Sequence, residues 1–172
     1  MVKEMPEVKL SRSERFLRNI IQHYNEEKYW RYRENVINGG GIVCQLKLLY
    51  IKRCDAFNNA TFGTHIGFGA TFLEKPNLPH GLYGIVISHN AVIGRNATIF
   101  HQVTIGEGKD GAPVIGDNVL IGSGAKIIGN IRIGNNVKIG AGCVVSENIP
   151  DFSTVVMEKP RIIHRNQKTD IV

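Results

Sequence analysis

The stretch that decides the fold is residues 118–145, NVLIGSGAKIIGNIRIGNNVKIGAGCVV. Within it an apolar β-branched residue returns every six positions, at Ile121, Ile127, Ile133, Ile139 and Val145. An α-helix repeats about every 3.6 residues and a flat strand every 2, so neither element alone produces this period. A short strand followed by a tight turn, repeated many times, does produce it. The pattern therefore predicts a β-solenoid.

The same register continues towards the N-terminus. A ten-residue step crosses Gly108–Pro113, and the sixes then resume at Ile105, Ile99, Ile93 and Ile87. Apolar or small residues also stand two positions before each of these ladder residues, at Ile85, Ala91, Ala97, Val103, Pro113, Val119, Ala125, Ile131, Val137 and Cys143. We expect the isoleucines to stack in the interior, each contributing roughly 1.5–3 kcal/mol through burial. A β-sandwich is the alternative, but sandwich strands recur irregularly and do not hold one register for so long.

Length and amino-acid composition limit the number of domains, the possible partners and the cellular setting. The chain has 172 residues, which predicts one domain with a small appendage, and its 42% hydrophobic content is sufficient for a core. The net charge of +6 is concentrated in residues 1–55, with eleven Lys/Arg against seven Asp/Glu. This bias fits either an anionic partner or a solvated helical face. The three cysteines have no metal-type spacing, and no apolar run is long enough to span a membrane, so we expect a reduced, cytoplasmic setting.

The chain divides into three expected parts. Residues 1–57 form a helical segment, with one helix from Ser11 to about Ile37 and a second from about Ile42 to Arg53, where a strand is the alternative. Residues 58–157 form the solenoid, interrupted by loops at 74–84 and 107–113. Residues 158–172 form a basic tail. Interruptions of a solenoid usually emerge on one side, often the binding side.

His80 is the first candidate for chemistry. It lies in the first interruption, between Pro79 and Gly81. An imidazole can accept a proton near neutral pH, so it can act as a general base. A surface or structural histidine in a turn is the alternative reading of the same position.

A resemblance to a known family begins at this histidine. The segments Pro79–Ile87, Ala91–Gly94, Gln102–Gly106, Ile121–Asn130 and Lys138–Gly142 resemble the hexapeptide-repeat acyltransferases of the serine acetyltransferase type. The resemblance covers about residues 58–163. It implies a mainly β protein, a left-handed parallel β-helix with a short N-terminal α-helical segment. It also implies a homotrimer with active sites between subunits, and acetyl transfer from acetyl-coenzyme A (acetyl-CoA) to a hydroxyl.

The same resemblance implies roles for individual residues. His80 falls on the catalytic histidine, and His101 and Tyr83 are expected to contact the substrate. The backbone groups of Gly106, Ala125 and Ala141 are expected to meet acetyl-CoA, with Lys159 and Arg161 near its phosphates. The chemistry requires neither a metal nor a covalent enzyme intermediate, and nothing in the resemblance implies nucleic acid.

Departures from the family pattern bear on the acceptor. Serine acetyltransferases carry an aspartate where Pro79 stands, a second near Asn59, and another histidine where Gly111–Pro113 lies. We therefore expect a sugar hydroxyl in surface polysaccharide synthesis as the acceptor, since the chain resembles the short capsular O-acetyltransferases. Serine O-acetylation in cysteine biosynthesis is the alternative.

A non-catalytic scaffold or a metal-binding solenoid is a further alternative to the enzyme. A metal site would need about three converging histidines. His80, His89 and His101 supply the number, but their offsets from the isoleucine ladder differ. We therefore expect that these three do not line one corner.

Overall fold

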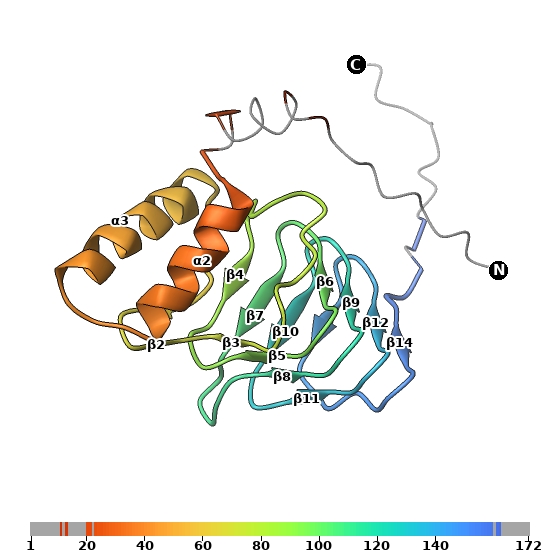
Figure 1. The fold of residues 1–172 in the computed structure, drawn as a ribbon. Helices are drawn as coiled ribbons and strands as arrows, with labels where there is room; N and C mark the ends of the chain where they lie inside the picture. The colour runs from red at the N-terminus through yellow and green to blue at the C-terminus, as the bar shows by residue number, and fades with distance from the viewer. Residues whose placement is uncertain (1–10, 12, 14–19, 22, 160, 163–172) are drawn as a thin grey trace, which may run out of the picture.

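The computed structural model describes residues 11, 13, 20–21, 23–159 and 161–162. Helices α2 (Glu26–Ile37) and α3 (Ile42–Phe57) come first, and short strands follow (Figure 1). The strands are β1 (Thr64–His65), β2 (Phe68–Gly69), β3 (Thr71–Phe72), β4 (Val86–Ile87), β5 (Val92–Ile93), β6 (Thr98–Ile99), β7 (Thr104–Gly106), β8 (Val114–Ile115), β9 (Leu120–Ile121), β10 (Lys126–Ile128), β11 (Arg132–Ile133), β12 (Lys138–Ile139), β13 (Val144–Val145) and β14 (Thr154–Val155). No described helix is long and apolar enough to cross a bilayer.

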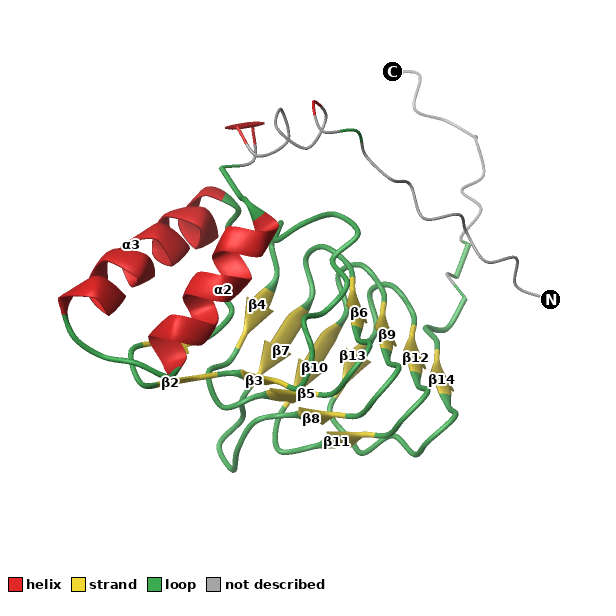
Figure 2. Cartoon of the chain, in the orientation of Figure 1, coloured by secondary structure: helices red, strands yellow, loops and turns green. Residues whose placement is uncertain are grey.

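The strands stack into three parallel four-stranded sheets. Sheet 1 has the order β4-β7-β10-β13, sheet 2 has β3-β5-β8-β11, and sheet 3 has β6-β9-β12-β14 (Figure 2). The chain runs through sheets 1, 2 and 3 in turn. Ile87 pairs with Ile105, eighteen residues further on, so three hexapeptides complete one turn. This is the predicted solenoid, and hexapeptide repeats are typical of the left-handed β-helix.

The isoleucine ladder fills the interior. All nine predicted isoleucines, from Ile87 to Ile139, and Val145 at its end are buried. The pairing also keeps them in register, since Ile105 pairs with Ile127 and Ile127 with Val145. Like side chains therefore stack on like side chains, and the apolar area removed from water is continuous along the axis. The predicted core is confirmed.

The corner between sheets 2 and 3 is a polar ladder. Asn96, Asn118 and Asn136 each have positive φ there, which asparagine tolerates better than most residues. The side-chain amide of Asn96 donates to Asn118, and that of Asn118 donates to Asn136. The next turn breaks the series, because Phe152 holds φ 59° while 79% of its surface is exposed.

Extra residues emerge at the two other corners. The corner between sheets 1 and 2 carries the hairpin β1–β2, which the sequence did not predict, and the predicted loop 107–113. Each adds four residues, since the steps Thr61 to Thr71 and Thr104 to Val114 span ten positions instead of six. The corner between sheets 3 and 1 carries the other predicted loop. The loops therefore do not emerge on one side.

The two helices cover the N-terminal end of the solenoid, with α2 between α3 and the sheets (Figure 1). The aromatic rings of Trp30, Phe62 and Phe72 meet there, and Trp30 lies edge-on to both others at 5.6 and 5.1 Å between ring centroids. The buried Arg33 donates to the carbonyls of Phe62 and Ala70. These contacts seal the first turn of the ladder from water.

The helix boundaries differ from the sequence prediction. The predicted helix from Ser11 to Ile37 is interrupted, because His23 has positive φ and Asn25 is an extended N-cap whose side chain accepts from the Lys28 amide. Most of its first half lies outside the described residues. The second helix begins at Ile42 as predicted, but continues one turn past Arg53, to Phe57. The strand alternative at this segment is wrong.

Replacing Phe152 by asparagine should stabilise the fold. The left-handed conformation costs a residue such as phenylalanine about 1 kcal/mol, and asparagine relieves much of that cost. Chemical unfolding of Phe152→Asn should show a higher free energy of unfolding than the parent. The mirror variant Asn136→Phe should be less stable. Equal stability of all three proteins would show that this corner does not select asparagine.

Candidate functional site

The segment 78–85 places His80 at the corner between sheets 3 and 1. Asn77 to Val86 covers nine positions where Thr98 to Thr104 covers six, so three residues are extra here. Gly81 and Gly84 turn the chain with positive φ, and a side chain at Gly84 would press on Gln102 at 3.0 Å. Leu82 is buried and anchors the segment, while His80 and Tyr83 are exposed.

The ring of His80 stacks on the ring of His101 from the next turn. The centroids are 4.6 Å apart and the planes are inclined by only 6°. Phe100 lies edge-on to His80 at 5.7 Å, so two rings from one neighbouring strand end define the plane of His80. Within the described residues, no carboxylate hydrogen-bonds to either imidazole. The rings of Phe100 and His101 therefore fix the orientation of the His80 ring.

The three histidines His80, His89 and His101 were predicted not to line one corner, and this is correct for His89 but wrong for the other two. His80 and His101 line one corner because the three extra residues before Val86 cancel the apparent difference in their offsets. His89 does lie elsewhere, at the corner between sheets 1 and 2, with its ring 5.7 Å from that of His65. Among the described residues, no group of three or more His, Cys, Asp and Glu is placed to hold a metal ion.

Ser123 continues the same corner one turn further. Its hydroxyl oxygen lies 3.4 Å from Nδ1 of His101, where either atom can be the donor. The backbone also links the turns, since Gly124 donates to the His101 carbonyl at 3.0 Å. Ser123 was not among the site residues predicted from the sequence. Ser123 follows His101 by 22 residues, which is one 18-residue turn plus the four residues inserted in loop 107–113. Counting in this way along the sequence would have identified it.

A cavity of about 490 Å³ opens beside the two histidines. Six of the described residues line it: Ile21, Phe57, Asn58, His80, Tyr83 and His101. The predicted catalytic and substrate residues are thus brought together. Phe57 and Asn58 were missed, because they stand where the chain leaves α3 and enters the first turn of the solenoid, and only the folded chain brings this junction beside the loop that carries His80. The wall combines two imidazoles with aromatic and apolar surface, as binding sites for small molecules usually do.

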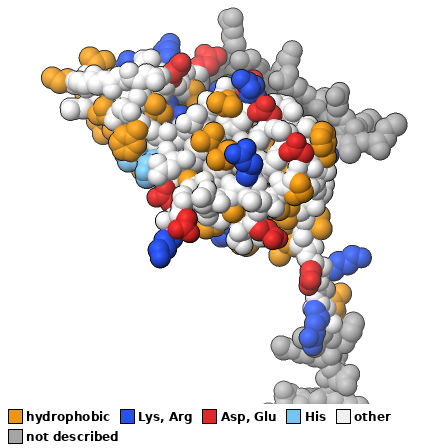
Figure 3. All heavy atoms as spheres, turned by 90° about the horizontal axis from the view of Figure 1, so that it is seen from below, with side chains coloured by type: hydrophobic (Ala, Val, Ile, Leu, Met, Phe, Trp, Pro, Cys, Tyr) orange, Lys and Arg blue, Asp and Glu red, His pale blue; other side chains and the backbone are white. Residues whose placement is uncertain are grey.

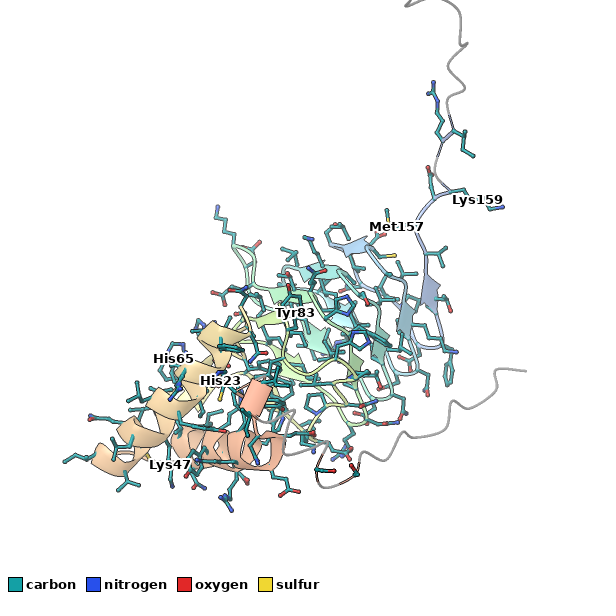
Figure 4. All side chains as sticks on the ribbon, turned by 90° about the horizontal axis from the view of Figure 1, so that it is seen from above. His23, Lys47, His65, Tyr83, Met157 and Lys159 are labelled. Carbon is teal, nitrogen blue, oxygen red and sulfur yellow. The ribbon has the colours of Figure 1, made fainter. Side chains whose placement is uncertain are left out.

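The predicted acetyl-CoA residues are spread over the solenoid. Gly106 ends β7 at the corner between sheets 1 and 2, whereas Ala125 and Ala141 lie at the corner between sheets 3 and 1. The methyl group of Ala125 is buried, and Ala141 is exposed. Lys159 and Arg161 are exposed beyond β14, and Figure 4 shows Lys159 at the opposite end of the molecule from the helices. The assignment of these five residues stays a prediction.

Two residues before Phe57, α3 buries a carboxyl group. Asp55 is 3% exposed and accepts a hydrogen bond of 2.6 Å from the hydroxyl of Tyr29. Burial raises the pKa of Asp55 to about 6, against the opposing effect of that hydrogen bond. Burial likewise lowers the pKa of Arg33 to about 10. The end of α3 that supplies the cavity wall therefore rests on a buried polar network.

Comparison with known proteins gives this arrangement a context. Residues 112–147 match the family described as bacterial transferase hexapeptide (six repeats). The chain is 44% identical to a serine acetyltransferase of Bacillus subtilis (strain 168) over 110 residues, which cover 62% of this chain and 50% of that protein. It is 47% identical to a serine acetyltransferase of Staphylococcus aureus (strain Mu50 / ATCC 700699) over 98 residues, covering 55% and 46%. The chain thus spans about half the length of the curated relatives it matches.

Solved structures agree with the sequence matches. A serine acetyltransferase isoform 3 from Entamoeba histolytica in complex with cysteine superposes with a TM-score of 0.65 at 31% identity, over 81% of this chain and 49% of that one. A serine acetyltransferase from Neisseria gonorrhoeae in complex with serine gives 0.61 at 35% identity, over 78% and 54%. The resemblance to the serine acetyltransferase type of hexapeptide acyltransferase is supported.

The predicted sugar acceptor in polysaccharide synthesis is wrong, because the matched proteins are serine acetyltransferases and one of the structures holds serine. The prediction rested on the departures at Asn59, Pro79 and Gly111–Pro113, and the identities of the matched proteins outweigh them. In the structure, the imidazole that stands beside His80 is that of His101 on the adjoining turn.

The buried Asp55 predicts a specific pH dependence. Its pKa is higher in the folded chain than in the unfolded one, so the folded state is favoured while the group is protonated. That advantage, up to roughly 3 kcal/mol, is lost as pH rises from about 4 through about 6. Asp55→Asn keeps an oxygen for the Tyr29 hydroxyl and removes the charge. Its stability relative to the parent should therefore increase between pH 4 and pH 7.5 in urea unfolding.

The exposed Asp110→Asn is the matched control, since its charge is removed where water already solvates it. It should not show the same pH-dependent gain. A constant difference between Asp55→Asn and the parent across this pH range would contradict the burial argument.

Proposed function

We propose that this protein transfers an acetyl group from acetyl-CoA to the hydroxyl of L-serine, as a step of cysteine biosynthesis. The observation that carries the proposal is the stacked pair of His80 and His101 in the wall of the 490 Å³ cavity. The names of the relatives support the acyl donor and the acceptor. A cytoplasmic location and a homotrimer belong to the same proposal.

His80 acts as the general base. A serine hydroxyl is a poor nucleophile at neutral pH, so a base must remove its proton as the oxygen attacks the thioester carbonyl. The new bond joins the serine oxygen to the acetyl carbon, and the carbon–sulfur bond breaks. His80 then returns its proton to the departing thiolate. Proton and leaving group therefore balance without any further reactant.

His101 and Tyr83 serve the acceptor in this proposal. His101 sits against His80 and also contacts Ser123, so its ring has a defined position from which one nitrogen can meet a hydroxyl or carboxylate oxygen. Tyr83 lines the same cavity and its side chain is exposed. A single amino acid fills only part of this volume. The remainder suits the reactive end of the acyl donor.

Acetyl-CoA is proposed to extend from the cavity along the outside of the solenoid. Ala141 offers exposed backbone at the corner that carries His80, and the cationic side chains of Lys159 and Arg161 suit phosphate groups. Ala125 contributes less directly, because its N–H is bonded to the Gly122 carbonyl and its own carbonyl accepts from Thr104. Gly106 lies at the other edge of sheet 1, at the corner between sheets 1 and 2 and not at the corner that carries His80.

Removing the base should remove the activity. With acetyl-CoA and L-serine, release of free thiol by His80→Ala should fall by about 10²–10⁴-fold, the usual contribution of a general base. His89→Ala is the matched control, since it deletes an imidazole at the neighbouring corner and should leave the rate near that of the parent. Full activity of a folded His80→Ala protein would overturn the assignment. No thiol release by the parent with L-serine would overturn the proposed acceptor.

A further inference from the structure

Ser123 contacts His101 from the next turn of the solenoid. Its hydroxyl oxygen lies 3.4 Å from Nδ1 of His101, and Gly124 donates to the His101 carbonyl at 3.0 Å. The same backbone link recurs one turn earlier, where Gln102 donates to the Tyr83 carbonyl at 3.0 Å. Tyr83, His101 and Ser123 therefore form one column along this corner, and the coil itself fixes the hydroxyl beside the ring.

The contact at Nδ1 determines what the other ring nitrogen of His101 can do. A neutral imidazole carries a single hydrogen, so one of its nitrogens donates and the other accepts. The described part of the chain forms no other hydrogen bond to this ring. When the Ser123 hydroxyl donates to Nδ1, the ring hydrogen stands on Nε2, and Nε2 becomes a donor.

The cavity wall needs such a donor. L-serine, the proposed acceptor, carries a carboxylate, and an anion without a partner is costly to remove from water. None of the described lining residues is Lys or Arg. The side-chain amide of Asn58 already donates to the Cys54 carbonyl, and His80 has to accept a proton as the base. Of the described lining residues, His101 and Tyr83 are the donors that remain.

The cationic side chains described elsewhere do not take this place. Lys126 is exposed at the start of β10, shortly after Ser123, but it does not line the cavity. Figure 4 shows Lys47 and Lys159 far from Tyr83. On the face seen in Figure 3, basic side chains over the solenoid are interspersed with acidic ones and form no single patch. Within the described chain, recognition of the carboxylate therefore falls to the wall itself.

We propose that Nε2 of His101 donates to the carboxylate of the acceptor, and that Ser123 is the positioning residue that keeps the hydrogen on Nε2. This inference rests on the proposed acetylation of L-serine. In L-serine the carboxylate and the hydroxyl stand on neighbouring carbon atoms, so their partners in the site must also be neighbours. His101 meets this condition, because its ring stacks on that of His80 at 4.6 Å. Hydrogen bonds to charged groups are the stronger ones, so the site selects a free amino acid over an amide of serine.

Two acceptors that differ in charge test the carboxylate contact. In thiol-release assays the parent should prefer L-serine to L-serinamide, which keeps the hydroxyl and replaces the carboxylate by a neutral amide. His101→Phe keeps a planar ring against His80 and removes Nε2. The preference, measured as the ratio of the two kcat/KM values, should therefore fall by about tenfold or more. Ser123→Ala should lower it mainly through a higher KM for L-serine, and Ser123→Thr should restore it because threonine keeps the hydroxyl.

A second readout needs no substrate. In NMR spectra of protein with nitrogen-labelled histidine, recorded where the ring is neutral, His101 is identified by its absence from His101→Phe. Its ring should carry the hydrogen on Nε2, and its Nδ1 signal should move when Ser123→Ala removes the donor. Ser88→Ala is the matched control for both readouts, since it deletes a hydroxyl that bonds to Glu107 at the neighbouring corner. It should change neither the preference nor this signal.

The outcomes separate this inference from the proposed function. If the parent acetylates L-serine but neither His101→Phe nor Ser123→Ala lowers the preference, the inference is wrong and the proposed function stands. Loss of the preference in Tyr83→Phe alone would assign the carboxylate to Tyr83 and would equally refute it. A parent ring with its hydrogen on Nδ1 would remove the role of Ser123. No thiol release with L-serine would overturn the proposed function and this inference together.

Discussion

The structure depends on one packing constraint: buried isoleucines must lie directly over one another. Each strand in the three parallel sheets is only two or three residues long, so no strand can be stable by itself. Hydrogen bonds to the turns on either side, together with the continuous apolar interior, hold it in place. An insertion or deletion inside a strand would shift the ladder residue out of the core. Variation in length is therefore confined to the corners.

The confinement of insertions to corners is what creates the candidate site. Three extra residues between Asn77 and Val86 let the chain leave the regular coil and return without disturbing the ladder. The loop so formed holds His80 over the corner, and the regular turn beneath it supplies His101. A stack of turns thus brings together side chains that are 21 residues apart, at a place where each can be exposed. The stacking of His101 on the proposed general base His80 is therefore a consequence of the 18-residue turn together with the three inserted residues.

The helical end of the molecule has several structural roles. Its inner face is aromatic and closes the first turn, and it encloses the hydrogen-bonded pair of Tyr29 and Asp55. Its last residues, Phe57 and Asn58, form part of the cavity wall. Its outer face carries the exposed apolar residues Ile42, Leu46 and Leu49 of α3. The helical end thus contributes both to the core and to the candidate site.

The amino-acid sequence by itself determined the solenoid, the buried ladder and the position of His80 in an interruption, because a strict six-residue period leaves a chain few ways to bury its isoleucines. It also determined the start of α3, where three glycines end the preceding segment. Only the tertiary structure decided which interruptions share a corner, that His101 stacks on His80, and that Phe57 reaches the cavity. Those relations depend on how many residues each corner absorbs, and a linear register cannot show this until the turns are stacked. The acceptor was misjudged for a different reason, since departures from a family motif at a few positions were given more weight than the match of the chain as a whole.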